Sequence, residues 1–243
     1  MARVLCAALL CGAIANAATA ADVCTSPTGN LAYRYRVVTS LGDFEIELCR
    51  TDNEVTVDNF ISYIEDGSYT NSSFIHRSLR IADAGIDIVQ GGGWTVTPPP
   101  GVERVAAKAA IPLNSKLPNL RGTLAMARTS ELDSATSQWF LNVEDNPGLD
   151  PTPGNPKSGY TVFGQVISGM ATVDAMAAVP TYDMGGYFTD LPLDGYVDPM
   201  ASPIDHMIYV TDYVWLPEPG SAVQCAAMLL TLAGLASQRR RDR

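Results

Sequence analysis

Basic side chains are scarce through most of this 243-residue chain. Five of its 16 Lys and Arg residues lie at the two extreme ends, whereas residues 21–216 contain 11 basic residues against 24 Asp and Glu, a net charge of −13. A body this acidic repels a phosphate backbone, so we expect no nucleic-acid partner.

Residues typical of metal and nucleophilic chemistry are also few. The two histidines, His76 and His206, are not spaced with cysteines or carboxylates as metal ligands are. The chain has no G-x-S-x-G elbow and no glycine-rich loop followed by Lys-Ser or Lys-Thr. The sequence therefore predicts no metal site and no cofactor.

The first 20 residues are typical of a secretory signal peptide. Arg3 precedes a short apolar run over 4–14, and Ala18-Thr19-Ala20 forms an A-x-A cleavage site. We expect residues 1–20 to be removed on export, leaving residues 21–32 as an N-terminal lead.

Cysteine use bears on the same compartment. Cys6 and Cys11 leave with the signal and Cys225 lies near the C-terminus, so Cys24 and Cys49 remain in the body. An oxidising compartment permits a disulfide between them. Two separate thiols are the alternative, because sequence alone does not set their distance.

The body shows short strand patterns and two helical ones. Residues 33–39 and 43–49 alternate apolar and polar side chains as paired strands do. Helical spacing follows Thr56, the expected N-cap, and recurs before Pro180. Residues 183–205, rich in Gly, Asp and Pro, read as a surface loop. Without a βαβ rhythm, this pattern predicts a mainly β fold, an antiparallel barrel or a sandwich.

The C-terminus carries a separate module. Pro217-Glu218-Pro219 precedes an apolar run over 222–236, which ends before Arg239, Arg240 and Arg241. The run is shorter than the roughly 20 residues of a spanning helix, and the arginines fit a cytoplasmic end. Residues 213–243 resemble the PEP-CTERM sorting signal of Gram-negative bacteria. That resemblance implies retention at the membrane of the cell envelope and processing by an exosortase-type enzyme.

Three blocks of sequence are distinctive in the body. They are Phe74-Ile75-His76-Arg77 with Val89-Gln90-Gly91-Gly92-Gly93, Arg121-Gly122-Thr123-Leu124-Ala125-Met126-Ala127-Arg128 with Gln138-Trp139-Phe140, and Gly159-Tyr160-Thr161-Val162-Phe163-Gly164. Residues 33–212 thereby resemble the cyclophilin family, in its bacterial periplasmic branch. The resemblance implies a closed eight-stranded antiparallel barrel capped by two α-helices, acting as a monomer on proline-containing polypeptides.

The chemistry of X-Pro isomerisation explains why such residues suffice. Amide conjugation sets a rotation barrier of about 18–20 kcal/mol, so a catalyst needs a pocket for the proline ring and a donor that stabilises the twisted amide. The resemblance implies that Arg77 is this donor, that Gln90 orients it, and that Phe140 lines the proline pocket. It assigns the remaining substrate-binding positions to Ile88, Ala127, Arg128, Gln138, Leu149 and Tyr160.

The chain departs from the family between Arg77 and Gln90. Twelve residues separate them, more than is usual, and Asp87 stands where many relatives carry an aromatic residue. The leading interpretation is a peptidyl-prolyl isomerase that assists folding of exported proteins. The alternative is a weakly catalytic proline-peptide-binding chaperone, or a docking module of the envelope or matrix.

Overall fold

The computed structural model describes residues 23–24, 33–70, 72–81, 85–98, 101–155 and 157–217. The predicted signal peptide and the apolar run of the predicted tail lie outside these ranges. Within them, no helix is both long enough and apolar enough to cross a membrane.

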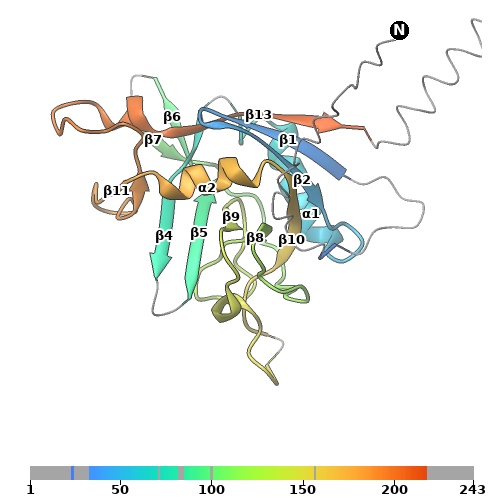
Figure 1. Cartoon of the computed structure of the whole chain (residues 1–243). Helices are drawn as coiled ribbons and strands as arrows, with labels where there is room; N and C mark the ends of the chain where they lie inside the picture. The colour runs from blue at the N-terminus through green and yellow to red at the C-terminus, as the bar shows by residue number, and fades with distance from the viewer. Residues whose placement is uncertain are drawn as a thin grey trace, which may run out of the picture.

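Eleven strands of the described body form one antiparallel sheet, in the spatial order β4-β5-β9-β8-β10-β2-β1-β13-β3-β6-β7 (Figure 1). Its strands are β1 (Tyr33–Thr39), β2 (Gly42–Leu48), β3 (Ser73–Ile75), β4 (Arg77–Ile81), β5 (Ile86–Gly91), β6 (Trp94–Thr97), β7 (Gly101–Arg104), β8 (Thr123–Met126), β9 (Trp139–Asn142), β10 (Val162–Ser168) and β13 (Ile208–Leu216). A separate ribbon pairs β11 (Thr181–Tyr182) with β12 (Leu191–Pro192).

β4, at one end of this strand order, follows directly in the chain on β3, which lies toward the other end. β3 pairs with β13 and β4 pairs with β5, yet only His76 separates β3 from β4. The His76 N–H donates to the carbonyl oxygen of Gln90 at 3.0 Å, which ties this junction to β5. Counted as one interrupted strand, β3 and β4 complete a ring of eight with β5, β9, β8, β10, β2, β1 and β13. The predicted mainly β fold is confirmed.

Two helices among the described residues cover the sheet. α1 (Glu54–Glu65) inserts Phe60 against Trp139 and Phe163 of the sheet, with ring centroids 6.4 and 5.1 Å away. α2 (Met170–Ala178) lies across β2, β4 and β5 (Figure 1) and ends before Pro180, as predicted.

The predicted start of the first helix is wrong. α1 begins at Glu54, with Asn53 as its N-cap residue, and Thr56 is a buried residue of the first turn. The Asn53 side-chain amide donates to the carbonyl oxygen of Val162 at 2.6 Å, so a contact distant in sequence fixes where the helix begins.

Residues 183–205 are more than the surface loop that their composition predicts. Leu191, Leu193 and Tyr196 are buried in a second hydrophobic cluster with Phe74 and Met207. These apolar side chains hold the segment against the sheet, and β12 lies beside β4.

Both ends of the described body are fastened to the sheet. Cys24 and Cys49 form a disulfide, the first of the two alternatives that the sequence left open. β13 continues to Leu216, opposite Arg34 of β1. Residues 213–216, expected as the start of the tail, therefore belong to the sheet.

Candidate active site

Strand register brings the three predicted catalytic residues into one row. Arg77 in β4 lies opposite Gln90 in β5, and Gln90 lies opposite Phe140 in β9. Residues directly opposite one another in an antiparallel sheet point to the same face. Because neighbouring strands are about 4.8 Å apart, the row from Arg77 to Phe140 spans about 10 Å.

A cleft of about 590 Å³ opens on this face. Five predicted site residues line it, namely Arg77, Gln90, Ala127, Arg128 and Gln138. Its remaining lining residues are His76, Trp94, Arg104, Thr129, Ser134, Thr136, Gly186, Tyr187 and Thr189.

The other four predicted residues form an apolar cluster beside the cleft. Ile88, Phe140 and Leu149 are buried there, and Tyr160 packs against them with its ring perpendicular to Phe140 at 5.6 Å. The Arg128 guanidinium lies 4.9 Å from the centre of the Tyr160 ring, so it joins the cluster to the polar cleft. An apolar ring held over this cluster would lie within reach of the long side chain of Arg77.

Arg77 is held by a residue that the sequence did not indicate. Its Nε lies 3.2 Å from Oδ2 of Asp190, and the Thr189 hydroxyl donates to the same oxygen at 2.9 Å. The backbone N–H of Ser78 donates to the carbonyl oxygen of Asp190 at 2.9 Å. The ion pair uses Nε, so the terminal nitrogens of the guanidinium stay available for a substrate carbonyl.

Gln90 makes a different contact from the one that the family resemblance implies. Its side-chain amide donates to Oε1 of Gln138 at 2.8 Å. Among the described residues, the side-chain partner of Arg77 is Asp190. Gln90 and Gln138 thus brace one another along the floor of the cleft, and Asp190 orients the arginine.

His76 stays uncharged at the wall of the cleft. Burial, aided by the adjacent positive charge of Arg77 and opposed by a hydrogen bond with Gln138, lowers its pKa from 6.5 to about 3. The turn at Gly92 and Gly93, between β5 and β6, lets the backbone pass close to His76. Gly92 has φ +74°, and a Cβ there would lie 2.5 Å from the carbonyl oxygen of Ser137.

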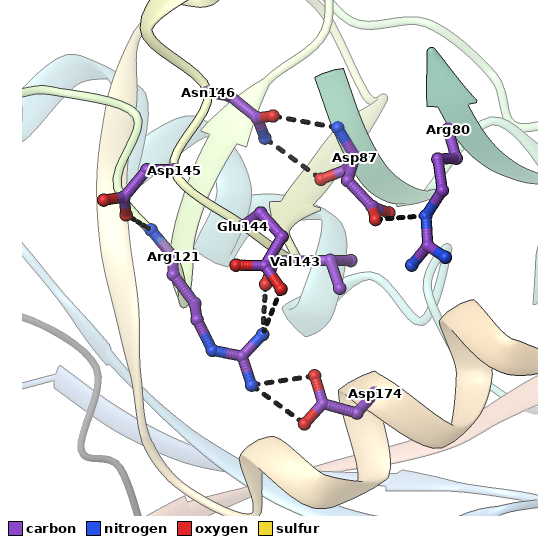
Figure 2. A network of polar contacts seen from close by, with 8 residues as sticks. All are labelled: Arg80, Asp87, Arg121, Val143, Glu144, Asp145, Asn146 and Asp174. Atoms are coloured by element: carbon purple, nitrogen blue, oxygen red, sulfur yellow. Dashed lines mark hydrogen bonds and ion pairs between the residues drawn. The ribbon is translucent and has the colours of Figure 1, made fainter. Parts of the chain in front are cut away.

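The extra residues between Arg77 and Gln90 lengthen the β4–β5 hairpin without placing Asp87 in the cleft. Figure 2 shows the Asp87 carboxylate turned toward Nε of Arg80, 2.5 Å away. The backbone of Asp87 exchanges two hydrogen bonds with the Asn146 side chain, at 2.8 and 3.0 Å. In the same view, one terminal nitrogen of Arg121, Nη2, donates to both carboxylate oxygens of Asp174 in α2, at 2.8 and 2.9 Å. These contacts brace the hairpin and α2 outside the cleft.

Comparisons with known proteins agree with this geometry. Residues 34–194 match the family described as cyclophilin type peptidyl-prolyl cis-trans isomerase/CLD. The peptidyl-prolyl cis-trans isomerase of Acinetobacter baylyi is 42% identical over 149 residues, which cover 60% of this chain and 73% of the relative. Isomerase A of Dickeya dadantii is 40% identical over 156 residues, covering 62% of this chain and 74% of the relative.

A solved structure shares the fold at lower identity. A cyclophilin type isomerase of Cryptosporidium parvum superposes with a TM-score of 0.56 at 20% identity, covering 77% of this chain and 99% of that chain. This likeness supports the fold assignment.

Proposed function

The chain belongs to the family of cyclophilin-type peptidyl-prolyl cis-trans isomerases, and from that premise we propose that it acts on X-Pro bonds of polypeptides exported from the cytoplasm. Isomerisation needs no covalent intermediate, because the reaction only rotates an amide bond. The enzyme has to bind the twisted amide more tightly than the planar one.

The row Arg77–Gln90–Phe140 carries this proposal. The proline ring rests on the apolar cluster around Phe140, and the terminal nitrogens of Arg77 donate to the carbonyl oxygen as conjugation is lost. Arginine suits this role because its charge is permanent and its donors have a fixed geometry. Gln90 and Gln138 hold the adjoining chain in the cleft.

Replacing Arg77 tests the assignment. We expect Arg77→Ala to lower kcat/KM for a proline tetrapeptide by about a hundredfold, the scale on which one preorganised donor acts. Arg36→Ala is the matched control, since Arg36 lies on β1, outside the cleft, in an exposed pair with Glu45. Equal activity of Arg77→Ala and wild type would refute the mechanism.

Export is the second part of the proposal. The signal-like residues 1–20 and the Cys24–Cys49 disulfide support an oxidising compartment, because such bonds are rare in the cytosol. The PEP-CTERM-like tail supports retention at the membrane and exosortase-type processing. Fractionation of cells producing the full chain and a chain ending at residue 217 tests this. We expect the full chain in the envelope fraction and the shortened one in the periplasm; identical distribution of both would refute the role of the tail.

The ion pair between Arg77 and Asp190 favours a second candidate function. In this candidate the carboxylate of Asp190 weakens the field of the guanidinium at the substrate more than it orients the group. The domain then serves as a proline-peptide-binding chaperone or envelope docking module with weak turnover. Calorimetric binding of proline peptides without catalysed exchange would favour this candidate, whereas catalysed exchange at ordinary rates would exclude it.

A further inference from the structure

Arg104 forms a stacked cationic group at the cleft, beyond the residues assigned to isomerisation. It ends β7 directly opposite Trp94 of β6. Its guanidinium lies 5.0 Å from the centre of the Trp94 ring and 4.3 Å from that of Tyr187. All three residues line the cleft. Trp94 is buried, whereas Tyr187 is 67% exposed and lies in the segment after β11.

Most arginines of the described body are paired with carboxylates. This holds for Arg34, Arg36, Arg50, Arg77, Arg80 and Arg121. Within the described ranges the exceptions are Arg104, which stacks on rings, and Arg128, which donates to backbone carbonyls of Gly159 and Thr129. Both exceptions line the cleft.

This distribution is unexpected in a body where acidic residues outnumber basic ones by 24 to 11. Among the described residues, three arginines line the cleft and no carboxylate does. Asp190 pairs with Arg77 but is not itself a lining residue, and neither is Glu103, the neighbour of Arg104. Clefts lined by one sign of charge concentrate ligands of the other sign. The cleft is therefore a local basic site on an acidic protein.

Arg104 is exposed although its guanidinium contacts two rings, so the N–H donors of the guanidinium stay accessible to a ligand. Aromatic rings engage the faces of a guanidinium, while its N–H donors point outward in the plane and match a carboxylate. Stacking also fixes the side chain in advance, which lowers the entropic cost of binding.

We propose that Arg104, held by Trp94 and Tyr187, recognises an acidic side chain that flanks the substrate proline. This inference rests on the proposed function and names its substrate class: X-Pro segments that carry Glu or Asp within reach of the cleft.

Isomerisation rates of a peptide series test this. The peptides are made in pairs, and each peptide contains one proline. One member of a pair carries a single Glu at a chosen position near the proline, and the other carries Gln at the same position. Rates are measured by NMR exchange, which avoids the charge preference of a coupling protease. At the position that reaches Arg104, we expect Glu to raise kcat/KM about fivefold over Gln at low salt. The ratio should fall toward one at about 0.5 M salt, where the Debye length is only a few Å.

Charge variants identify the residue responsible. Arg104→Gln is expected to remove the Glu-over-Gln ratio, and Arg104→Glu to replace it with a preference for Lys. Arg36→Gln, which removes one positive charge on β1, should keep the wild-type ratio.

The outcomes separate this inference from the proposed function. Normal turnover of neutral peptides with equal Glu and Gln rates would overturn the acidic preference alone. A ratio that survives in Arg104→Gln, or a preference unchanged in Arg104→Glu, would overturn the assignment to Arg104. Absence of turnover for every peptide would overturn the isomerase proposal itself.

Discussion

The charge of the His76 imidazole depends strongly on folding. It is 4% exposed, and its pKa falls from 6.5 to about 3 in the folded state. The unfolded chain therefore takes up this proton first as the pH falls. The stability that comes from keeping His76 neutral is therefore fully present above pH 6.5. Between pH 6.5 and 3 the free energy of unfolding falls by up to about 1.4 kcal/mol per pH unit.

We expect His76→Gln to remove this component of the pH dependence. The measurement is the free energy of unfolding in urea from pH 7.5 to 4, for wild type and variant. The slope is the readout, so a constant loss of stability at all pH values does not affect the result. Parallel slopes for the two proteins would show that His76 is not the acid-sensitive group.

Single residues were predictable where a local sequence block fixed them. Arg77, Gln90 and Phe140 stand in such blocks, and strand pairing brings them together. Asp190 was missed because it lies in a Gly/Asp/Pro-rich stretch with no pattern of its own. Arg104 was missed because its role depends on contact with Tyr187, which lies in the same patternless stretch as Asp190.

At the scale of elements, the segment between α2 and β13 determines how Arg77 is presented. The ribbon of β11 and β12 lies beside β4, and the backbone hydrogen bond from Ser78 to Asp190 fixes its register there. Burial of Leu191, the first residue of β12, and of Leu193, directly after the strand, anchors the carboxylate of Asp190 that holds Arg77. The segment therefore positions Arg77, the residue that we propose as the catalytic donor.

Removing the carboxylate should therefore affect catalysis more than stability. We expect Asp190→Ala to lower kcat about three- to tenfold with little change in KM, because a loosely held donor stabilises the twisted amide less well. Asp190→Asn, which keeps an acceptor for Nε, should recover most of the rate. Since both partners are partly exposed, the free energy of unfolding should fall by only about 1 kcal/mol or less.

Asp198→Ala is the matched control for this experiment. Asp198 lies in the same segment and is exposed, and its carboxylate accepts from the backbone N–H of Met200 at 2.9 Å. The substitution Asp198→Ala removes one negative charge and leaves the contacts of Arg77 unchanged, so we expect the same kcat and KM as for wild type. A rate loss in Asp198→Ala equal to that in Asp190→Ala would assign the effect to net charge.

Elements with strict periodicity were predicted well. β1 has the predicted bounds, β2 begins one residue earlier than predicted, and α2 ends before Pro180. Residues 183–205 were misread because their buried side chains are spaced irregularly among turn residues. Their partners, Phe74 and Met207, come from distant parts of the chain, and local patterns carry no trace of such contacts.

At the scale of the whole molecule, contacts distant in sequence complete the ring. β1 pairs with β13, so the first strand lies beside the last. Alternation of apolar residues predicts that these strands exist but not which strand each one joins. The resemblance to a known family supplied that part of the prediction.

The Cys24–Cys49 disulfide adds a covalent tie to this ring and links stability to compartment. It spans 25 residues of sequence. A loop of that length contributes about 3–4 kcal/mol by restricting the unfolded chain. We expect Cys24→Ala to lose this amount in urea unfolding, and wild type to lose the same amount when dithiothreitol is added.

The variant serves as its own control, because Cys24→Ala should not respond further to dithiothreitol. This matters since the chain has three other cysteines, whose reduction could otherwise be confused with that of the disulfide. Equal stability of oxidised and reduced wild type would show that the bond is not a structural support. If the disulfide contributes the expected value of about 3–4 kcal/mol to the free energy of unfolding, a chain that folds in a reducing cytoplasm lacks that stability. The isomerase domain then reaches its full stability only in an oxidising compartment.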